Sequence, residues 1–142
     1  MSRRTFLIES RTENLEPLRK DLAQALGGPG LSEKELYGIL VSVVEACTNS
    51  IRHAYGNAPD GKIHITVDDR KDRVILKIRD YGKKIDLAKI PSPTLPPVNP
   101  GGLGIYFMKT FTDELKYNTR HARGTELTLV KYKNRSPNKE EP

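Results

Sequence analysis

Two short runs in the middle of the chain, each alternating apolar with polar residues, constrain the fold most. They are joined by the polar stretch DDRKD, and their apolar members are Ile63, Ile65 and Val67, then Val74, Leu76 and Ile78. A period of two is typical of strands with one buried face, and a short polar connection between them predicts an antiparallel hairpin. The chain must therefore supply other elements that cover one face of a sheet.

The segments before the hairpin supply one more strand and two helices. Residues 4–10 (RTFLIES) alternate like a short strand, and residues 14–26 have the apolar spacing of a helix, which the glycines after it stop. Ser32 followed by Glu35 is the signature of a capping box, in which each side chain reaches an amide at the start of a helix. This pattern predicts a long helix that begins after Ser32 and ends near Ala54.

The segments after the hairpin predict a long loop, one helix and two closing strands. Residues 83–100 contain a short helical possibility at 86–90 and then the proline-rich PSPTLPPVNP, whereas GGLGIYFMKTF reads as a helix, and ELKYN and GTELTLVKY read as strands. Paired strands with separate helices predict an α+β fold, a two-layer sandwich of helices on a mixed, largely antiparallel sheet. We expect one domain over residues 1–133 and a disordered tail over 134–142.

Composition narrows the classes of function. The 142 residues include no apolar run near the roughly 20 residues of a membrane span and no signal peptide, so we expect a cytoplasmic protein that does not contact membranes. Cys47 is the single cysteine, which excludes an internal disulfide, and its place on the apolar side of the long helix predicts burial. The formal charge of +6 is scattered among acidic residues, which argues against direct nucleic-acid binding.

The long helix carries a polar row within an apolar stretch. Glu45, Asn49 and His53 follow one another at a spacing of four in VVEACTNSIRHAYG. Such a row is usually a solvent-facing stripe. The alternative is functional, because a carboxylate and a carboxamide one turn apart can present oxygens to hydrated Mg²⁺ or to an attacking hydroxyl.

Three further segments have both a structural and a functional interpretation. Asp80 and Gly82 in IRDYGKK are typical of a turn, yet a carboxylate at a strand end can also accept a hydrogen bond from a ligand's amino group, such as that of adenine. The glycines of PGGLGIYF directly precede a helix, where exposed amides can receive phosphate oxygens. The pair Gly124 and Thr125 most often makes only a turn, but the Thr125 hydroxyl can assist a contact to a nucleobase.

Taken in order, these segments carry a resemblance to a known family. EACTNSIRHAY, DYG, a long loop ending in GGLGIYFMKTFTDEL, and GT resemble the GHKL, or histidine-kinase-like, ATPase superfamily from Ser32 to Val130. The single-domain length, HAY after the asparagine, and GIYFMKTFTDEL are most similar to the anti-sigma factor serine-protein kinases. The resemblance implies the Bergerat-type fold of that superfamily, with helices on a mixed sheet.

The resemblance also implies a site for ATP and Mg²⁺ between the long helix and the lid loop. Asn49 would ligate Mg²⁺, and Glu45 would be the general base that orients or deprotonates the acceptor hydroxyl. Asp80 would bind the adenine amine, with Gly82 beside the ring and Thr125 assisting. Phosphoryl transfer suits these residue types, because its transition state is stabilised chiefly by positioning and charge.

The remaining implied roles concern phosphates and partners. Gly102, Leu103 and Gly104 would hold the phosphates at the start of their helix, and His53 would lie near the same end of the site. The implied partners are a sigma factor, which the protein would sequester, and an anti-sigma factor antagonist, whose Ser or Thr it would phosphorylate. Members of the family typically act as homodimers, and we expect a homodimer here.

Two departures from the family pattern keep alternatives open. Lys84 stands where the superfamily motif DxGxG has its second glycine, and no arginine occurs between Asp86 and Gly101. A nucleotide-sensing module that binds ATP or ADP without kinase activity is therefore one alternative. A detached catalytic domain of a sensor histidine kinase is another, although the segment before Ser32 contains no histidine for phosphorylation.

Overall fold

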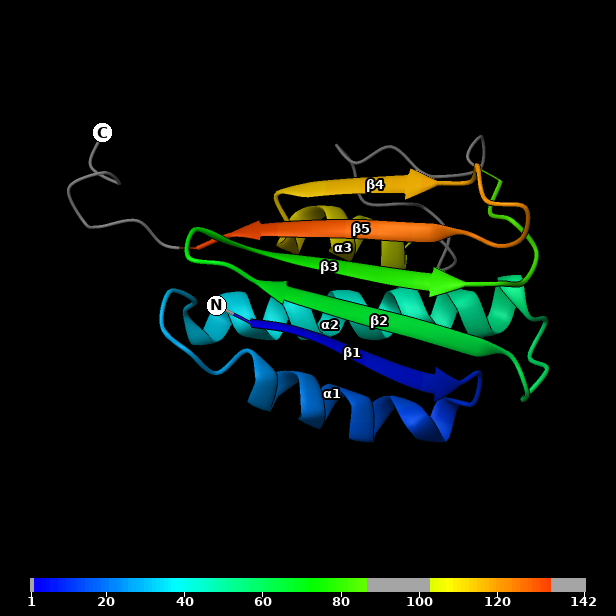
Figure 1. The fold of residues 1–142 in the computed structure, drawn as a ribbon, viewed down its shortest axis with the longest axis horizontal. Coiled ribbons are helices and arrows are strands. Elements are labelled where there is room, and N and C mark those ends of the chain that lie inside the picture. The colour runs from blue at the N-terminus through cyan, green and yellow to red at the C-terminus, as the bar shows by residue number, and fades with distance from the viewer. Residues whose placement is uncertain (1, 87–102, 134–142) are drawn as a thin grey trace.

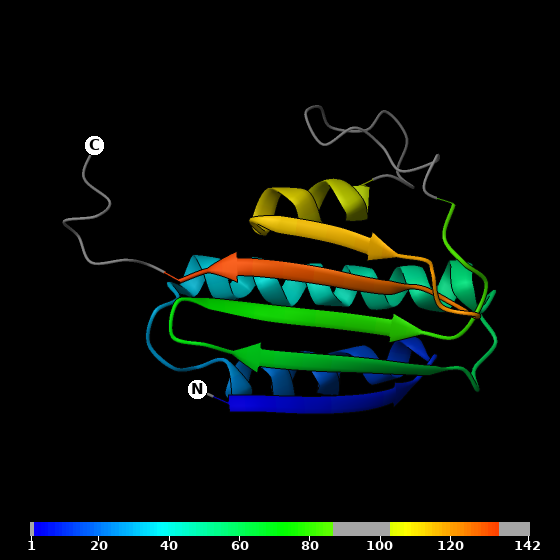
Figure 2. The same cartoon turned by 45° about the horizontal axis from the view of Figure 1, so that its top comes forward.

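The computed structural model describes residues 2–86 and 103–133, which form one five-stranded sheet with helices packed on one face (Figures 1 and 2). The strands are β1 (Ser2–Glu9), β2 (Lys62–Asp69), β3 (Arg73–Asp80), β4 (Glu114–Asn118) and β5 (Glu126–Tyr132). Their order across the sheet is β1-β2-β3-β5-β4, and every neighbouring pair is antiparallel. The α+β class is thus confirmed, and the sheet that the sequence predicts to be mixed and largely antiparallel has no parallel pair among the described strands.

Three α-helices and two tighter or wider helical turns make the second layer. They are η1 (Thr12–Asn14), a 3-10 turn, α1 (Leu15–Ala25), α2 (Glu33–Asn49), η2 (Ser50–Ala54), a π-helical turn, and α3 (Leu103–Phe111). Helix α2 lies between α1 and α3 and contacts both of them. Because η2 continues α2, the long helix ends at Ala54, where the sequence predicts its end, but with a wider last turn.

The buried face of the sheet follows from the period-two pattern. One row of side chains crosses all five strands, because the residues are direct partners from one strand to the next: Phe6, Ile65, Ile78, Leu127 and Tyr117. The members on the three central strands are almost fully buried. Apolar side chains of α1, α2 and α3 pack on this face and make one core.

The long helix is built as its sequence predicts. The Ser32 hydroxyl accepts a hydrogen bond from the Glu35 amide at 3.0 Å, and the Glu35 carboxylate accepts one from the Ser32 amide at 2.9 Å. These two bonds satisfy amides that the first turn leaves unpaired. Cys47 is fully buried, and burial raises the pKa of its thiol to about 12, so the thiolate that would react does not form near neutral pH.

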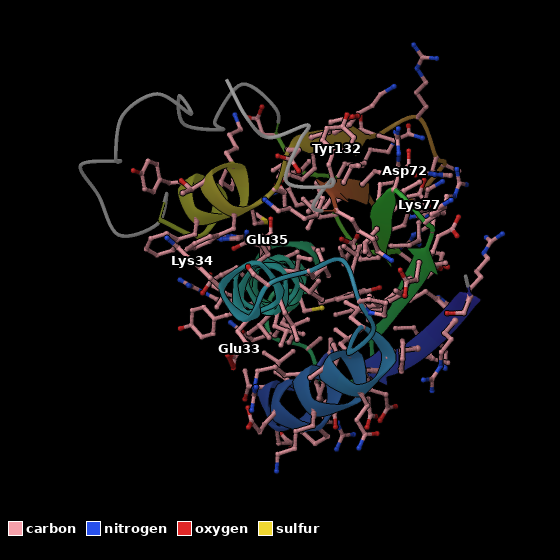
Figure 3. All side chains as sticks on the ribbon, turned by 90° about the vertical axis from the view of Figure 1, so that its left-hand side faces the viewer. Glu33, Lys34, Glu35, Asp72, Lys77 and Tyr132 are labelled. Carbon is pink, nitrogen blue, oxygen red and sulfur yellow. The ribbon has the colours of Figure 1, made fainter. Side chains whose placement is uncertain are left out.

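The sandwich has two opposite ends, the capping end and the η2 end, which are formed by different segments of the chain. The capping end holds Ser32, the start of β3 and the end of β5, and Figure 3 views the two layers from that end, with Glu33 and Lys34 on the helical layer. The η2 end holds η2, the end of β3 and the start of β5 (Figure 1). The segments predicted to carry function therefore meet at one end of the sandwich.

Some expectations fall on parts that the structure does not describe. The short helical possibility at 86–90 and the tail at 134–142 lie outside the described residues. The single domain over residues 1–133 stays a prediction. Within residues 2–86 and 103–133, none of the helices has the length and hydropathy needed to cross a bilayer.

Candidate functional site

Asp80 is the centre of the η2 end. It is the last residue of β3, is 5% exposed, and has a carboxylate that accepts three hydrogen bonds. The Ser50 hydroxyl donates to Oδ2 at 3.0 Å, and the amides of Thr125 and Gly82 donate to Oδ1 at 3.2 and 3.3 Å. A buried carboxylate is therefore held by donors from η2, from the turn after β3 and from the segment before β5.

The environment of Asp80 raises its pKa above the ordinary 3.8, because burial disfavours the charged form. The bonds from Ser50 and from the Gly82 and Thr125 amides, together with the positive charge of Arg79, act in the opposite direction. An ionised carboxylate has about four acceptor positions, and three are occupied here. The remaining position is on Oδ2, so Asp80 can accept one more donor, such as an amino group.

The π-helical turn η2 brings Ser50 to Asp80. The Tyr55 amide donates to the Ser50 carbonyl at 3.0 Å, a bond that spans five residues instead of the four of an α-helix. Ser50 is 7% exposed and was not selected from the sequence. A signal was present, because Ser50 follows Cys47 by three residues and so falls on the apolar side of the helix, where a hydroxyl needs a partner.

Gly82 allows the turn after β3 to dock on η2. The Lys83 amide donates to the Ala54 carbonyl at 2.8 Å, and a Cβ on Gly82 would clash with that same carbonyl. Gly82 thus permits the backbone of this turn to approach the backbone at the end of η2 closely. Gly124 has a φ of +75°, and a Cβ there would clash with the Asp80 carbonyl, so it too serves the packing around Asp80.

Tyr55, the tyrosine of HAY, fastens the same region from the other side. Its hydroxyl donates to the Lys62 carbonyl at 2.6 Å and accepts a bond from the Tyr81 amide at 2.7 Å. Its ring lies against Gly61, where a Cβ would overlap the ring. One side chain therefore joins the end of η2 to the start of β2 and the end of β3.

Thr125 lies where the sequence placed it, beside Asp80, and it is 5% exposed. Besides its amide bond to the carboxylate, its carbonyl accepts from the Asp80 amide at 3.0 Å. Its hydroxyl accepts from the Ile85 amide at 3.0 Å. Thr125 thus holds both Asp80 and the segment that leads toward the lid loop.

Glu45, the first member of the polar row, lies against α3. Glu45 and Asn49 are half-buried, and a methyl group on Gly104 would lie 2.7 Å from Glu45 Oε2. The structure thereby brings Glu45 to the first turn of α3, whereas His53 is exposed at the far end of the row. Leu103 is the first residue of α3, and Gly102 lies outside the described residues.

The donor set near Asn49 limits how a cation could be held. In the described part of the chain, no three His, Cys, Asp or Glu side chains are grouped as metal ligands. Mg²⁺ commonly keeps several waters and takes one or two protein oxygens together with phosphate oxygens. The Asn49 carboxamide fits such a role as a single protein ligand.

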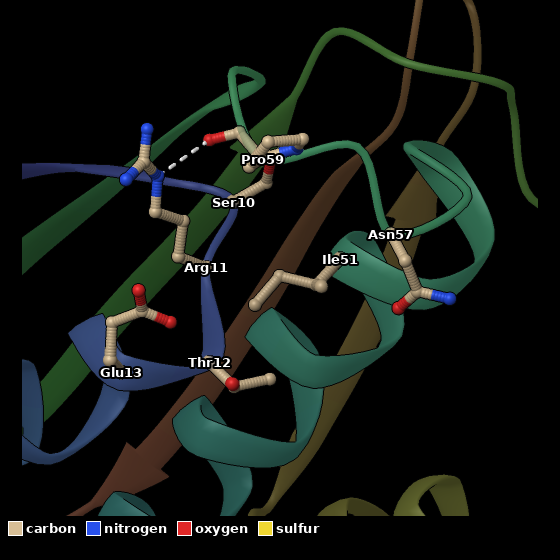
Figure 4. A pocket seen from close by; sticks show the side chains of 7 residues that line it. All are labelled: Ser10, Arg11, Thr12, Glu13, Ile51, Asn57 and Pro59. Atoms are coloured by element: carbon tan, nitrogen blue, oxygen red, sulfur yellow. Dashed lines mark hydrogen bonds between the residues drawn. The ribbon is translucent and has the colours of Figure 1, made fainter.

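A pocket of about 350 Å³ lies on the other side of η2 (Figure 4). Its lining residues are Ser10, Arg11, Thr12, Glu13, Ile51, Asn57 and Pro59. Arg11 Nε donates to the Pro59 carbonyl at 3.1 Å, which closes one side of it. None of the nine site residues predicted from the sequence lines this pocket, so it is separate from the site around Asp80.

Comparisons with known proteins identify the family to which the chain is similar. A family model described as the histidine kinase-like ATPase domain matches residues 8–131. The serine-protein kinase RsbW of Bacillus subtilis (strain 168) is 27% identical over 135 residues, covering 89% of this chain and 83% of the relative. The anti-sigma F factor of Anoxybacillus flavithermus is 36% identical over 106 residues, covering 72% of this chain and 73% of the relative.

A solved structure has the same fold. The crystal structure of the RsbU and RsbW domains of a Mycobacterium tuberculosis protein superposes with a TM-score of 0.67 at 17% sequence identity. The match covers 96% of this chain and 34% of that chain, so this chain corresponds to about a third of the larger protein. At this identity the likeness bears on the fold alone.

Proposed function

The chain belongs to the histidine kinase-like ATPase domain family, and from that premise we propose that it is an anti-sigma factor with ATP-dependent serine/threonine-protein kinase activity. It would sequester a sigma factor and phosphorylate an anti-sigma factor antagonist. The names of two relatives, a serine-protein kinase and an anti-sigma F factor, support the proposal. The single observation that carries it is the buried Asp80 carboxylate, which has one acceptor position left.

Asp80 binds the base in this proposal. Its remaining acceptor position on Oδ2 accepts a hydrogen bond from the exocyclic amine of adenine, because an ionised carboxylate only accepts hydrogen bonds. Gly82 has no side chain to obstruct the adenine ring, and the Thr125 amide donates a hydrogen bond to the carboxylate at 3.2 Å. His53 is exposed at the same end of α2 and η2, where a contact with the nucleotide stays a prediction.

The start of α3 receives the phosphates. The amides of Leu103 and Gly104 belong to the first turn of a nine-residue helix, which leaves them unpaired within the helix and at its positive end. Gly102 would contribute from the segment before. Asn49 offers its carboxamide oxygen to Mg²⁺, and the ion supplies charge that compensates the phosphate oxygens.

Glu45 orients the acceptor hydroxyl. Its carboxylate lies against Gly104, beside the amides that would hold the phosphates, so a Ser or Thr hydroxyl bonded to Glu45 would face the terminal phosphate. A carboxylate in that position accepts the hydroxyl proton as the new bond to phosphorus forms. The sigma factor, the antagonist and a homodimeric state are carried over from the family and not from contacts in the chain.

A phosphoryl-transfer assay tests the proposal. The protein is incubated with Mg²⁺, ATP labelled on its γ-phosphate and the antagonist encoded by the same organism, and we expect phosphoserine or phosphothreonine on the antagonist. Glu45→Gln should slow transfer about 100-fold or more while ATP still binds, because general-base catalysis typically contributes at least that factor. Glu33→Gln, an exposed glutamate on the same helix, is the matched control.

Two results would overturn the kinase part. One is no transfer to the antagonist by the wild-type protein, and the other is a Glu45→Gln variant that is as fast as the wild type.

A nucleotide-sensing module without kinase activity is the second candidate, and Lys84 favours it. This exposed lysine occupies the place of the second motif glycine, so the turn after Gly82 differs from that of the superfamily. Calorimetry separates the candidates: ATP binding that Asp80→Asn weakens, without turnover, supports the sensing module. Absence of nucleotide binding by the wild-type protein would remove both candidates.

A further inference from the structure

We propose that Ser50 is a positioning residue that fixes the Asp80 carboxylate so that its single free acceptor position selects a 6-amino purine over a 6-oxo purine. This inference rests on the proposed function and adds to it a residue that determines the base. Ser50 is the only side chain of the described residues whose hydrogen bond reaches that carboxylate, since the other two donors are backbone amides.

The two carboxylate oxygens of Asp80 accept different numbers of hydrogen bonds. Oδ1 accepts the amides of Gly82 and Thr125, so both of its acceptor positions are occupied. Oδ2 accepts only the Ser50 hydroxyl, at 3.0 Å. The one position that remains is therefore on Oδ2, and the bond from Ser50 decides which of its two positions stays free.

A single fixed acceptor discriminates between bases. An exocyclic amine donates to it, whereas an oxygen at the same place on a 6-oxo purine brings a second acceptor against it and leaves the carboxylate unpaired. Without the Ser50 hydroxyl, Oδ2 has two free acceptor positions, and the carboxylate loses the one side-chain hydrogen bond that fixes its orientation. The carboxylate can then turn, or take up a water, so that part of the preference for the amine is lost.

The backbone explains why Ser50 is held there. Its carbonyl accepts the Tyr55 amide across the wide turn of η2, and its side chain is 7% exposed against β3. The charged and titratable groups around Asp80 are Arg79, whose guanidinium donates to the Asp80 carbonyl, and the Tyr55 hydroxyl. Both remain when Ser50 is changed, so a substitution at Ser50 isolates one hydrogen bond.

The test measures binding of ADP and of inosine diphosphate to the full chain by calorimetry. Ser50→Ala should weaken ADP binding about fivefold, which corresponds to the net loss of one hydrogen bond, and leave inosine diphosphate binding nearly unchanged. The preference for ADP then falls by about the same factor. The matched control is Ser42→Ala, which removes a fully buried serine hydroxyl of α2, one that donates to the Gly38 carbonyl at 2.8 Å.

A second readout separates positioning from general loosening. The bond from Ser50 lowers the Asp80 pKa, so without it the pH at which ADP binding is lost on acidification should move upward. Ser42→Ala should leave that pH unchanged. If Ser50→Ala does not fold, Ser50→Cys, which has the same shape with a larger terminal atom and is a weaker donor, should show the same two changes to a smaller extent.

The outcomes distinguish this inference from the proposed function. If the wild-type protein binds neither diphosphate, the proposed nucleotide site fails and the inference fails with it. If the wild type binds ADP but Ser50→Ala keeps both the preference for ADP and the pH profile, only the role of Ser50 is overturned. An equal loss of both diphosphates would likewise contradict a role in base selection.

Discussion

The two ends of the sandwich hold their acidic side chains in different ways. At the capping end, Lys133 Nζ lies 2.6 Å from Asp69 Oδ1, and Lys131 Nζ lies 3.9 Å from Glu35 Oε2. At the η2 end, no lysine, arginine or histidine side chain of the described residues forms an ion pair with the Asp80 carboxylate, which accepts only neutral donors. Asp69 and Glu35 at the capping end thus have lysine partners, whereas Asp80 at the η2 end keeps its charge and an acceptor position for a ligand.

The largest expected effect comes from filling the contact that docks the Asp80 turn on η2. Gly82→Ala places a Cβ against the Ala54 carbonyl, which is backbone and has little freedom to move. We expect the free energy of unfolding to fall by about 3 kcal/mol and nucleotide binding to be lost, because the turn must move away from η2. Urea denaturation and calorimetry measure the two quantities.

Gly28→Ala is the control for that change. Gly28 lies between α1 and α2, and a Cβ there would meet no atom within 4 Å. Its free energy of unfolding should stay equal to that of the wild type or rise slightly. Equal stability of the two variants would show that the Gly82 contact is not needed.

Exchanging one acid at each end should separate binding from stability. Asp80→Asn puts an amide in place of the acceptor that the base would use, so we expect ATP affinity to fall about 30-fold, or about 2 kcal/mol, with little change in stability. Asp69→Asn removes the ion pair with Lys133 and should lower the free energy of unfolding by about 1 kcal/mol without altering affinity. Affinity losses of equal size in both variants would contradict the division between the ends.

A smaller effect is expected from the helix cap. Ser32→Ala removes the hydroxyl that accepts the Glu35 amide, and the free energy of unfolding should fall by about 1 kcal/mol. Nucleotide affinity should be unchanged, because Ser32 and Asp80 lie at opposite ends of the molecule (Figure 1). A clear loss of affinity in this variant would show that the two ends are coupled.

The smallest effect is the pH dependence that Asp80 contributes. The pKa of Asp80 is raised in the folded protein above 3.8, so folding favours its protonated form, and its contribution to stability increases as the pH falls through the raised pKa. Nucleotide binding should weaken as the pH falls, because only the ionised carboxylate has all its oxygen positions available as acceptors for the amine. Unfolding of the wild type and of Asp80→Asn at several pH values should show the wild type gaining relative to the variant on acidification.

Much of the fold was predictable because it depends on local patterns. The period-two runs of β2 and β3, the capping box at Ser32 and the helix at residues 14–26 all appear near their predicted places. The strand partners required long-range information, and from local patterns alone the sequence predicted a mixed, largely antiparallel sheet. Each pair turned out to be antiparallel among the described strands.

The sequence selected candidate site residues but could not give the connections between them. The sequence selected Glu45, Asp80 and Thr125, and the structure adds that the Thr125 amide binds the Asp80 carboxylate. Ser50 was missed because a regular helical period continues through this segment, whereas the chain forms a π turn there. The bond from Ser50 to Asp80 joins residues 30 positions apart, and no local pattern encodes such a partner.

The most direct test of the difference between the ends is an NMR titration of the ¹⁵N-labelled chain with Mg·ATP. We expect the amide signals of Ser50, Gly82 and Thr125 to shift most, while those of Ser32 and Glu35 stay in place. Shifts concentrated at the capping end, or no shifts at saturating ATP, would contradict it.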